Sequence, residues 1–391
     1  MSEIYKIGKL ILTDKVLENV YLEVKDGKFM GLYENDSQLN GEYTLIDYSN
    51  KIVGPGFVET HIHGYLGKDV MDGEIEGLNT IAQGLLSTGV TSWLPTTLTS
   101  SRQSLNDVCQ LIGENYQNIK GAKIQGIFLE GPYFTTKHKG AQNPDYMSDP
   151  VIEELKNWQA LSNQMIKKIA LAPEREHVIP FVEYAQSQNI KVGLAHSEAS
   201  FKQAEKAVKA GANIFVHTYN GMSGLHHREP GMVGAAMTLE HCYAEVIADG
   251  QHVHPKAIEV LVKSRGVEEV ILITDSMRAA GLGDGRSRLG EFEVEVKDGC
   301  ARLVEGGSLA GSILKMNEAV KNIVDWGIVD LPSAVRMASI NAAKSVGIEE
   351  KCGAIKLGFD ADFIVLNQNN ELEATYLNGQ KVYEAHLEGN Q

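Results

Sequence analysis

Short apolar runs alternate with amphipathic stretches through the middle of this chain. The apolar runs are PGFVETH, TSWLPTT, IQGIFLE, KKIALAPE, KVGLAHS, NIFVHT, AEVIADG and VILITDS. Amphipathic segments with helical spacing separate most of them, at residues 102–118, 177–188, 201–210 and 255–264. Strands interleaved with helices over about 290 residues predict an α/β protein built as a (β/α)8 barrel. A doubly wound sheet is the alternative, but none of the runs is followed by a glycine-rich dinucleotide-binding fingerprint.

The two ends of the chain have the alternating pattern of β-hairpins. Near the start, NVYLEVKDGKFMGLY alternates apolar and polar positions up to a D-G turn, and near the end ELEATYLNGQKVY contains an N-G turn. Neither end holds enough apolar surface to fold alone. We therefore expect residues 1–53 and 350–391 to pair as a small β-sandwich domain beside a catalytic barrel at residues 54–349. A further hairpin at residues 292–306 is predicted as an insertion after the eighth strand.

Composition narrows the choice of partner and compartment. The chain has 36 Lys and Arg against 51 Asp and Glu, a formal charge of −15, which argues against nucleic acid or an anionic membrane as a partner. A small anionic substrate remains compatible, because a pocket can be locally positive. The 4 cysteines lie far apart without the paired spacing of a zinc ribbon or redox motif, as expected for reduced thiols in a cytoplasmic protein. Neither a signal peptide nor an apolar run of roughly 20 residues that could span a bilayer is expected.

Ionisable residues stand where several of the predicted strands end. They are His61 and His63 after the first run, Glu130 after the third, His196 after the fifth, His217 after the sixth and Asp275 after the eighth. In a barrel the carboxyl ends of all strands meet at one face, so these side chains would converge there. Each residue alone also fits a structural role, such as a helix cap, a surface acid or a hydrogen-bonded core histidine. Their shared position at strand ends favours a metal site, and two histidines two residues apart on a strand can hold the same ion.

Sequence motifs make the interpretation more specific. The segment VGPGFVETHIHG resembles the opening motif of the amidohydrolase superfamily, whose first strand supplies H-x-H to a metal. The later GAIKLGFDADFIVL resembles the segment by which chains of that superfamily return to their small β domain. Within the superfamily, FLEGPY, LAHSEA, VHTYNGM, HHREPGMVGAA, ADGQHVHP, ITDSM and SLAGS resemble the N-acetylglucosamine-6-phosphate deacetylase family. Together these motifs extend from Pro55 to Asp362.

The resemblance implies a metal-dependent hydrolase that removes the acetyl group from N-acetyl-D-glucosamine 6-phosphate. The products would be D-glucosamine 6-phosphate and acetate, in amino-sugar catabolism and cell-wall recycling. By the same resemblance, Glu130, His196 and His217 hold the tighter metal, and His61 and His63 allow a second one. The implied cofactor is a divalent transition metal, zinc or iron, with two ions per subunit.

The resemblance also assigns the proton transfer and the substrate contacts. Asp275 matches the family residue that takes a proton from the attacking water and passes it to the departing sugar nitrogen. Arg228 and His252 match the phosphate binders, and because this Arg reaches the partner subunit's site in the family, a homodimer is implied. The implied sugar contacts are Ala141, Asn220, Gly221, Leu309, Ala310 and Gly311. Gln142 stands where other members often have a histidine near the substrate carbonyl, and an amide can donate a hydrogen bond there but carries no charge.

Two alternatives remain open from the sequence. Another amidohydrolase chemistry, such as hydrolysis of a cyclic amide or deamination, would share the barrel and the H-x-H motif but would not need the REPG and DGQH phosphate motifs. A non-catalytic scaffold built on the same barrel would be expected to lack metal-binding residues, whereas the set is complete in this sequence.

Overall fold

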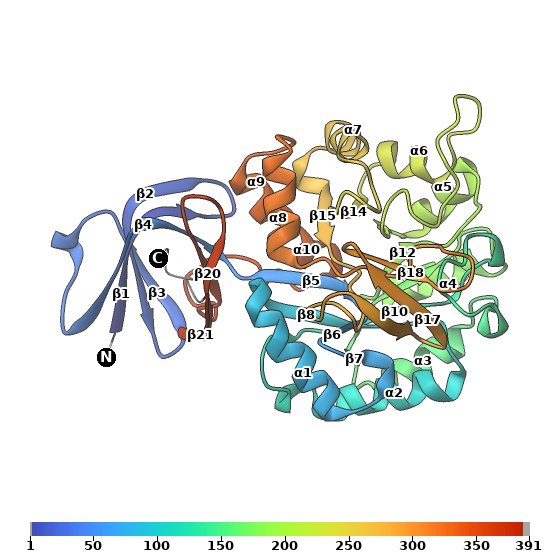
Figure 1. The fold of residues 1–391 in the computed structure, drawn as a ribbon, viewed down its shortest axis with the longest axis horizontal. Helices are drawn as coiled ribbons and strands as arrows, with labels where there is room; N and C mark the ends of the chain where they lie inside the picture. Colours follow the sequence, from blue (N-terminus) through green and yellow to red (C-terminus); the bar gives the residue numbers. More distant parts are fainter. Residues whose placement is uncertain (1, 386–391) are drawn as a thin grey trace.

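The computed structural model describes residues 2–385, and its larger part is a barrel of parallel strands (Figure 1). In chain order the barrel strands are β5 (Phe57–Ile62), β8 (Val90–Thr97), β10 (Ile127–Tyr133), β11 (Ile166–Leu171), β12 (Lys191–Leu194), β13 (Ile214–Phe215), β14 (Tyr243–Ile247) and β15 (Val270–Ile273). Each strand pairs in parallel with the next, and the short β9 (Lys123–Ile124) also pairs with β8. These strands coincide with the apolar runs, so the predicted barrel is confirmed.

Individual hydrogen bonds near the carboxyl ends join β5, the first strand of the barrel, to the residues that follow β15, the last strand. The Asp275 N–H donates to the His61 carbonyl oxygen at 2.9 Å. The buried carboxyl of Glu59 accepts from the backbone N–H groups of His61, at 3.0 Å, and Thr274, at 3.1 Å. Burial raises the pKa of Glu59 to about 7. The residues that close the barrel therefore include or adjoin His61 and His63, predicted as metal ligands, and Asp275, predicted to transfer the proton.

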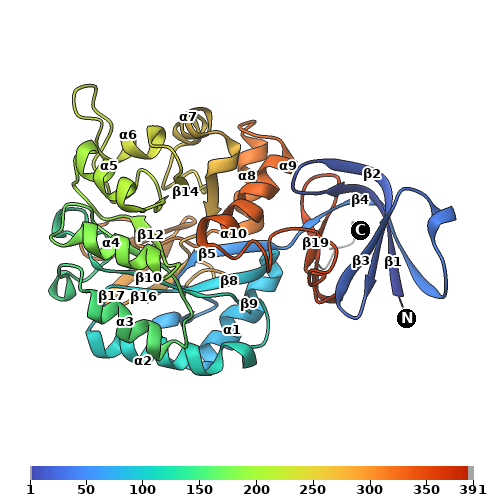
Figure 2. The ribbon, with the colours of Figure 1, turned by 180° about the vertical axis from the view of Figure 1, so that it is seen from behind.

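Helices cover the outside of the barrel, as Figures 1 and 2 show from opposite sides. They are α1 (Ile75–Leu85), α2 (Arg102–Asn115), α3 (Ile152–Leu161), α4 (Val178–Ser187), α5 (Phe201–Ala210), α6 (Gly231–Thr238), α7 (Pro255–Arg265), α8 (Met316–Asp325), α9 (Leu331–Met337) and α10 (Ile340–Val346). Ser101 and Ser200 begin α2 and α5 by accepting a backbone N–H of the first turn. The predicted helical segments correspond to α2, α4, α5 and α7. No helix among residues 2–385 is long and apolar enough to cross a bilayer.

Both ends of the chain form a second sheet beside the barrel (Figure 1). Its strands are β1 (Ser2–Ile11), β2 (Val16–Lys25), β3 (Lys28–Tyr33), β4 (Tyr43–Pro55), β19 (Phe363–Leu366), β20 (Leu372–Leu377) and β21 (Gln380–Glu384), in the spatial order β21-β20-β19-β4-β1-β2-β3. The sheet is continuous and curls over one core, because Phe29 of β3 and Tyr5 of β1 both contact Phe363 of β19. β1 and β4 pair in parallel, and the other neighbours are antiparallel. The domain boundaries at residues 53/54 and 349/350 stay a prediction.

Two smaller sheets extend the loops of the barrel. The predicted insertion is three-stranded: β16 (Gly285–Leu289) precedes the expected hairpin of β17 (Phe292–Lys297) and β18 (Cys300–Leu303). Its apolar residues pack with Leu98 and Met277 in a cluster of their own. A short hairpin of β6 (Gly64–Tyr65) and β7 (Lys68–Asp69) follows the first barrel strand. Both insertions therefore adjoin loops that leave the carboxyl ends of the barrel strands.

Candidate metal centre

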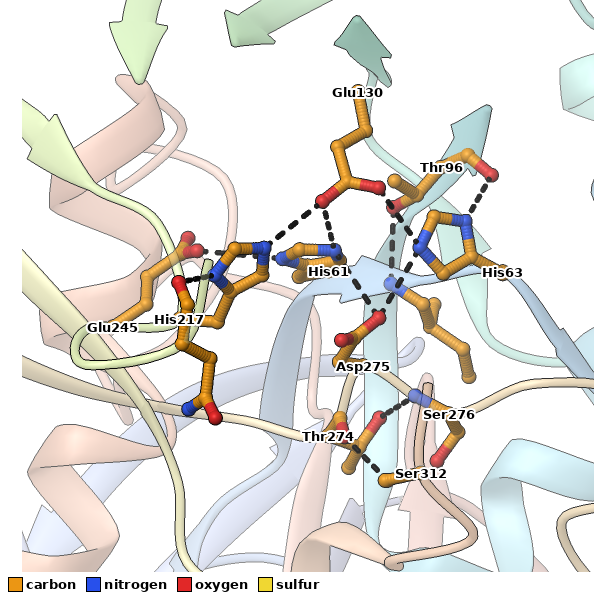
Figure 3. A network of polar contacts seen from close by, with 12 residues as sticks. His61, His63, Thr96, Glu130, His217, Glu245, Thr274, Asp275, Ser276 and Ser312 are labelled. Carbon is orange, nitrogen blue, oxygen red and sulfur yellow. Dashed lines mark hydrogen bonds and ion pairs between the residues drawn. The ribbon is translucent and has the colours of Figure 1, made fainter. Parts of the chain in front are cut away.

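A single carboxylate from β10 is surrounded by four imidazoles. Figure 3 shows three of them, those of His61, His63 and His217, around Glu130. Oε1 of Glu130 lies 3.3 Å from Nε2 of His61, 3.2 Å from Nε2 of His217 and 3.5 Å from Nε2 of His196. Oε2 of the same carboxylate lies 3.3 Å from Nε2 of His63. Because the two oxygens face different histidines, Glu130 joins one part of the centre to the other.

Asp275 completes the cluster from the end of β15. Its Oδ1 lies 3.2 Å from Nε2 of His63 and 3.4 Å from Nε2 of His61. With 13% of its side chain exposed, it is the most exposed of the six clustered residues. The structure thus brings together every residue for which the sequence predicted a metal-binding or proton-transfer role.

The six side chains form two groups of three potential ligands. One group is His61, His63 and Asp275, and the other is Glu130, His196 and His217. Atoms bonded to a tetrahedral ion at about 2.1 Å lie about 3.4 Å from one another. The separations measured within each group, 3.2 and 3.4 Å from Asp275 to the two histidines and 3.2–3.5 Å among Glu130, His196 and His217, have that size. Each group can therefore hold a cation without a large rearrangement.

The backbone turns sharply at three of these residues. His196, His217 and Asp275 have φ values of 45°, 34° and 50°, in the left-handed region that side chains other than glycine rarely occupy. Such a conformation costs on the order of 1–3 kcal/mol and is found where the surroundings hold it in place. Each of these left-handed residues stands just after a barrel strand, where the chain leaves the barrel: His196 after β12, His217 after β13 and Asp275 after β15.

The second ring nitrogen of each histidine also has a hydrogen-bond partner. For three histidines, the Nδ1–H donates to a backbone carbonyl oxygen at 2.8–3.2 Å. These pairs are His63 with Thr96, His196 with His138, and His217 with Asn220. Nδ1 of His61 instead lies 3.4 Å from a carboxylate oxygen of Glu245. In every case Nε2 is left facing the centre of the cluster.

The charges of the cluster are coupled. Burial alone would raise the pKa of Glu130, but the neighbouring imidazoles outweigh it and hold this pKa well below its usual range. Burial lowers the pKa of His217 and so favours its neutral form. Burial alone would lower the pKa values of His61 and His63, but the carboxylates of Asp275 and Glu130 outweigh it and raise these pKa values to about 9 and about 10. Because an ionised carboxylate and neutral imidazoles are the forms that bind a cation, these two histidines release a proton when they bind one.

A cavity of about 150 Å³ opens at the cluster. Seven of the predicted substrate contacts line it: Ala141, Gln142, Asn220, Gly221, His252, Leu309 and Gly311. The lining also includes Leu98, Gly140 and Leu289, which the sequence analysis missed. Leu289 comes from β16, a strand whose sequence GRSRL has no buried-strand pattern that would have drawn attention to it.

Two predicted substrate contacts lie elsewhere. Ala310 is buried in the apolar cluster of the insertion, and it is outside the cavity lining. Arg228 is exposed on the loop between β13 and α6, where its guanidinium lies 2.7 Å from Nε2 of His227. The described chain therefore does not place Arg228 at its own cavity, and the expected phosphate contact through a partner subunit stays a prediction.

Gln142 is fixed at both ends of its amide. Its Oε1 accepts the backbone N–H of Thr99 at 2.8 Å, and its Nε2 donates to Oε2 of Glu130 at 2.5 Å. These contacts orient the amide and leave it directly beside the carboxylate of the centre. The expected interaction with a substrate carbonyl stays a prediction.

Comparison of the chain with known proteins identifies its family. Residues 52–382 match the model described as the amidohydrolase family. The chain belongs to the amidohydrolase family. It is 40% identical to an N-acetylglucosamine-6-phosphate deacetylase of Vibrio furnissii over 85% of this chain and 83% of that protein. It is 36% identical to an N-acetylgalactosamine-6-phosphate deacetylase of Escherichia coli O157:H7 over 97% of this chain and 99% of the relative.

A solved structure supports the same relationship. The N-acetyl-D-glucosamine-6-phosphate deacetylase of Mycobacterium smegmatis, in a mutant form bound to N-acetyl-D-glucosamine 6-phosphate, superposes with a TM-score of 0.90. The two chains are 25% identical, and the match covers 97% of this amidohydrolase and 99% of that chain. The likeness extends over the barrel and the terminal sheet together.

The amidohydrolase family is metal-dependent, and the residues present fit that requirement. Nε2 of His61 is a buried polar atom without a hydrogen-bond partner in residues 2–385, although two carboxylates lie nearby. A cation there would give this nitrogen a partner. Imidazole and carboxylate ligands in compact groups suit a divalent transition metal.

Proposed function

We propose that this amidohydrolase hydrolyses the acetamide of N-acetyl-D-glucosamine 6-phosphate to D-glucosamine 6-phosphate and acetate. The observation that carries the proposal is the joint position of two ligand groups and seven predicted sugar-phosphate contacts around one cavity. Relatives named for this reaction, with 40% identity in the Vibrio furnissii protein, support it. The reaction would serve amino-sugar catabolism and cell-wall recycling in the cytoplasm, which agrees with four free cysteines.

The metal would be held by the two groups of side chains described above. Glu130, His196 and His217 would bind one cation, and His61 and His63, with Asp275, would bind the second. We propose zinc or iron, two ions per subunit, because both suit a nitrogen and oxygen ligand set. When bound, such a cation lowers the pKa of water from about 16 towards 7 and polarises a carbonyl oxygen.

Asp275 would carry the proton between the two halves of the reaction. Its carboxylate accepts a proton from the water that attacks the acetamide carbonyl. It then donates this proton to the sugar nitrogen as the C–N bond breaks, so acetate leaves and the carboxylate is restored. Oδ1 faces the histidines of β5, and the partial exposure of the side chain gives it access to the cavity.

The substrate phosphate would be bound at the mouth of the cavity. Nδ1 of His252 donates to Oδ2 of Asp249 at 2.6 Å, which fixes the ring where it lines the cavity. Arg228 would come from the partner subunit of a homodimer. Its position on an exposed loop outside its own cavity is compatible with that arrangement.

Acetate release tests the proposal. Purified protein supplied with zinc or iron should release acetate from N-acetyl-D-glucosamine 6-phosphate, and removal of metal by a chelator should abolish the release. The unphosphorylated sugar is the control for phosphate recognition. Failure of the metal-replete protein to release acetate would contradict the proposal, and equal kcat/KM for both sugars would favour another amidohydrolase chemistry.

A second candidate substrate is N-acetyl-D-galactosamine 6-phosphate. The observation in its favour is the Escherichia coli relative, which is named for that epimer and matches over nearly its whole length. The two sugars differ in the orientation of one hydroxyl group. Comparison of kcat/KM for both phosphorylated sugars decides between them, and a higher value for the galactosamine epimer would replace the first proposal.

A further inference from the structure

A buried ion pair lies beside the candidate metal centre. Lys168 of β11 and Glu245 of β14 both point into the barrel, and neither side chain has any exposed surface. The Lys168 ammonium donates to Oε1 of Glu245 and lies 3.7 Å from the centre of the Phe128 ring. The two opposite charges thus lie against one another inside the barrel, away from solvent.

Stability alone does not explain this pair. Removing two charges from water costs several kcal/mol per ion, and apolar residues of similar volume at such positions are often as stable or more so. Apart from the partly exposed Lys167, the rest of β11 is apolar, and the other buried residues of β14 are apolar, as the sequences IKKIAL and YAEVI show. A role for the charges must therefore be sought in what they contact.

The second oxygen of Glu245 provides that contact. Oε2 lies 3.4 Å from Nδ1 of His61, while Oε1 is occupied by Lys168. The carboxylate is therefore held between a cation on one side and a metal-facing imidazole on the other.

This arrangement sets His61 apart from the other three histidines of the cluster. Their Nδ1 atoms donate to backbone carbonyl oxygens, whereas that of His61 faces a charged side chain. A carboxylate partner fixes the tautomer with the proton on Nδ1 and makes Nε2 a stronger donor to a cation. The Nε2 atom of His61 lies 3.3 Å from Glu130 and 3.4 Å from Asp275, so it adjoins both ligand groups.

We propose that Glu245, held in place by Lys168, is a positioning residue that acts through His61 and sets the affinity of the cation bound by His61, His63 and Asp275. This inference rests on the metal centre of the proposed function. Lys168 holds the carboxylate in its orientation through the contact with Oε1. The cation at Glu130, His196 and His217 depends on this pair much less, because the histidines of that group have backbone partners.

Metal retention tests the inference directly. The variants are Glu245→Gln, which keeps the size of the side chain, and the double variant Lys168→Met/Glu245→Gln, which leaves no unpaired lysine. Metal per chain is measured by atomic emission after dialysis against graded concentrations of chelator. Both variants should bind the cation of His61, His63 and Asp275 roughly 10- to 100-fold more weakly than the wild type. They should retain the cation of Glu130, His196 and His217 as the wild type does. Asp362→Asn is the matched control, because it removes the carboxylate of the Lys123–Asp362 pair at the junction with the small sheet.

Additional variants separate a role of the Lys168–Glu245 pair in metal binding from a purely structural role. In a His63→Ala background, which weakens the same cation, Glu245→Gln should change the retention of the remaining cation less than threefold. Recovery of both thermal stability and metal retention in the double variant would assign the pair a purely structural role and overturn the inference. Wild-type retention in both variants, or equal loss of both cations, would overturn it as well.

The wild-type protein separates this inference from the proposed function. If the wild type binds two cations and releases acetate, but the variants retain metal normally, the inference alone fails. If the wild type binds only one cation and still releases acetate, the second site and this inference fail while the proposed function stands. If acetate release is absent from a chain that holds two cations, the proposed function fails and the variants still decide the inference.

Discussion

The substitution Asp275→Asn separates proton transfer from metal binding and from folding. Asparagine has nearly the same shape as aspartate, and its oxygen can occupy the position of Oδ1, which lies 3.2–3.4 Å from two histidines. Position 275 has a φ of 50°, a region that asparagine and aspartate tolerate better than most residues. Asp275→Ala would add backbone strain at the same position, so asparagine is the better test.

The expected loss follows from the role of the carboxylate. An amide cannot accept and return the proton, and general acid-base catalysis contributes about 10²- to 10⁴-fold to rates. We therefore expect kcat to fall by about that factor, or about 2.7 to 5.4 kcal/mol of transition-state stabilisation. The melting temperature should stay close to that of the wild type, because the fold contacts of residue 275 are made by its backbone.

The assay is acetate release from N-acetyl-D-glucosamine 6-phosphate at saturating metal and substrate. Metal per chain and thermal unfolding are measured on the same preparations. Activity within tenfold of the wild type, in a variant with normal metal content, would refute the assignment of Asp275 as the proton carrier. Loss of activity together with loss of metal would show that residue 275 acts mainly as a ligand.

Other substitutions test separate parts of the account. Arg228→Ala should raise KM for the phosphorylated sugar with little change in kcat, and an unchanged KM would remove Arg228 from phosphate binding. Gly221→Ala should weaken metal retention, because the added Cβ would lie 3.0 Å from Nδ1 of His196. The φ of +59° at this position also costs a residue other than glycine about 1–2 kcal/mol. Metal retention equal to that of the wild type would contradict this prediction. Lys123→Met should lower the melting temperature, because its ammonium contacts Asp360 and Asp362 across the junction, and a kcat unchanged at low temperature is the control.

The barrel was predictable because of how parallel strands are buried. Strands covered on both faces read as continuous apolar runs, and eight of them alternate with amphipathic helices. The position of His61, His63 and Glu130 at strand ends then identified one face of the barrel. The parallel pairing of β1 with β4 was beyond this reasoning, because alternation shows that a strand exists and not which neighbour it takes.

The backbone conformation, the charge pairing and part of the cavity lining at the site could not be predicted from the sequence. The left-handed backbone of His196 and His217 depends on the turns that leave the barrel, and histidine gives no local signal for it. Lys168 and Glu245 were visible as charges inside apolar runs, but their pairing requires the order of strands around the barrel. Leu289 reaches the cavity from an insertion whose first strand is mostly polar and exposed.

The central claim is that the imidazoles and carboxylates at the carboxyl ends of the barrel strands bind catalytic cations. The most direct test measures metal per chain and acetate release on one preparation while the metal is removed stepwise and then restored with zinc or iron. The account predicts that activity falls with metal content and returns with it. Full acetate release from a chain that has been shown to hold no transition metal would contradict it.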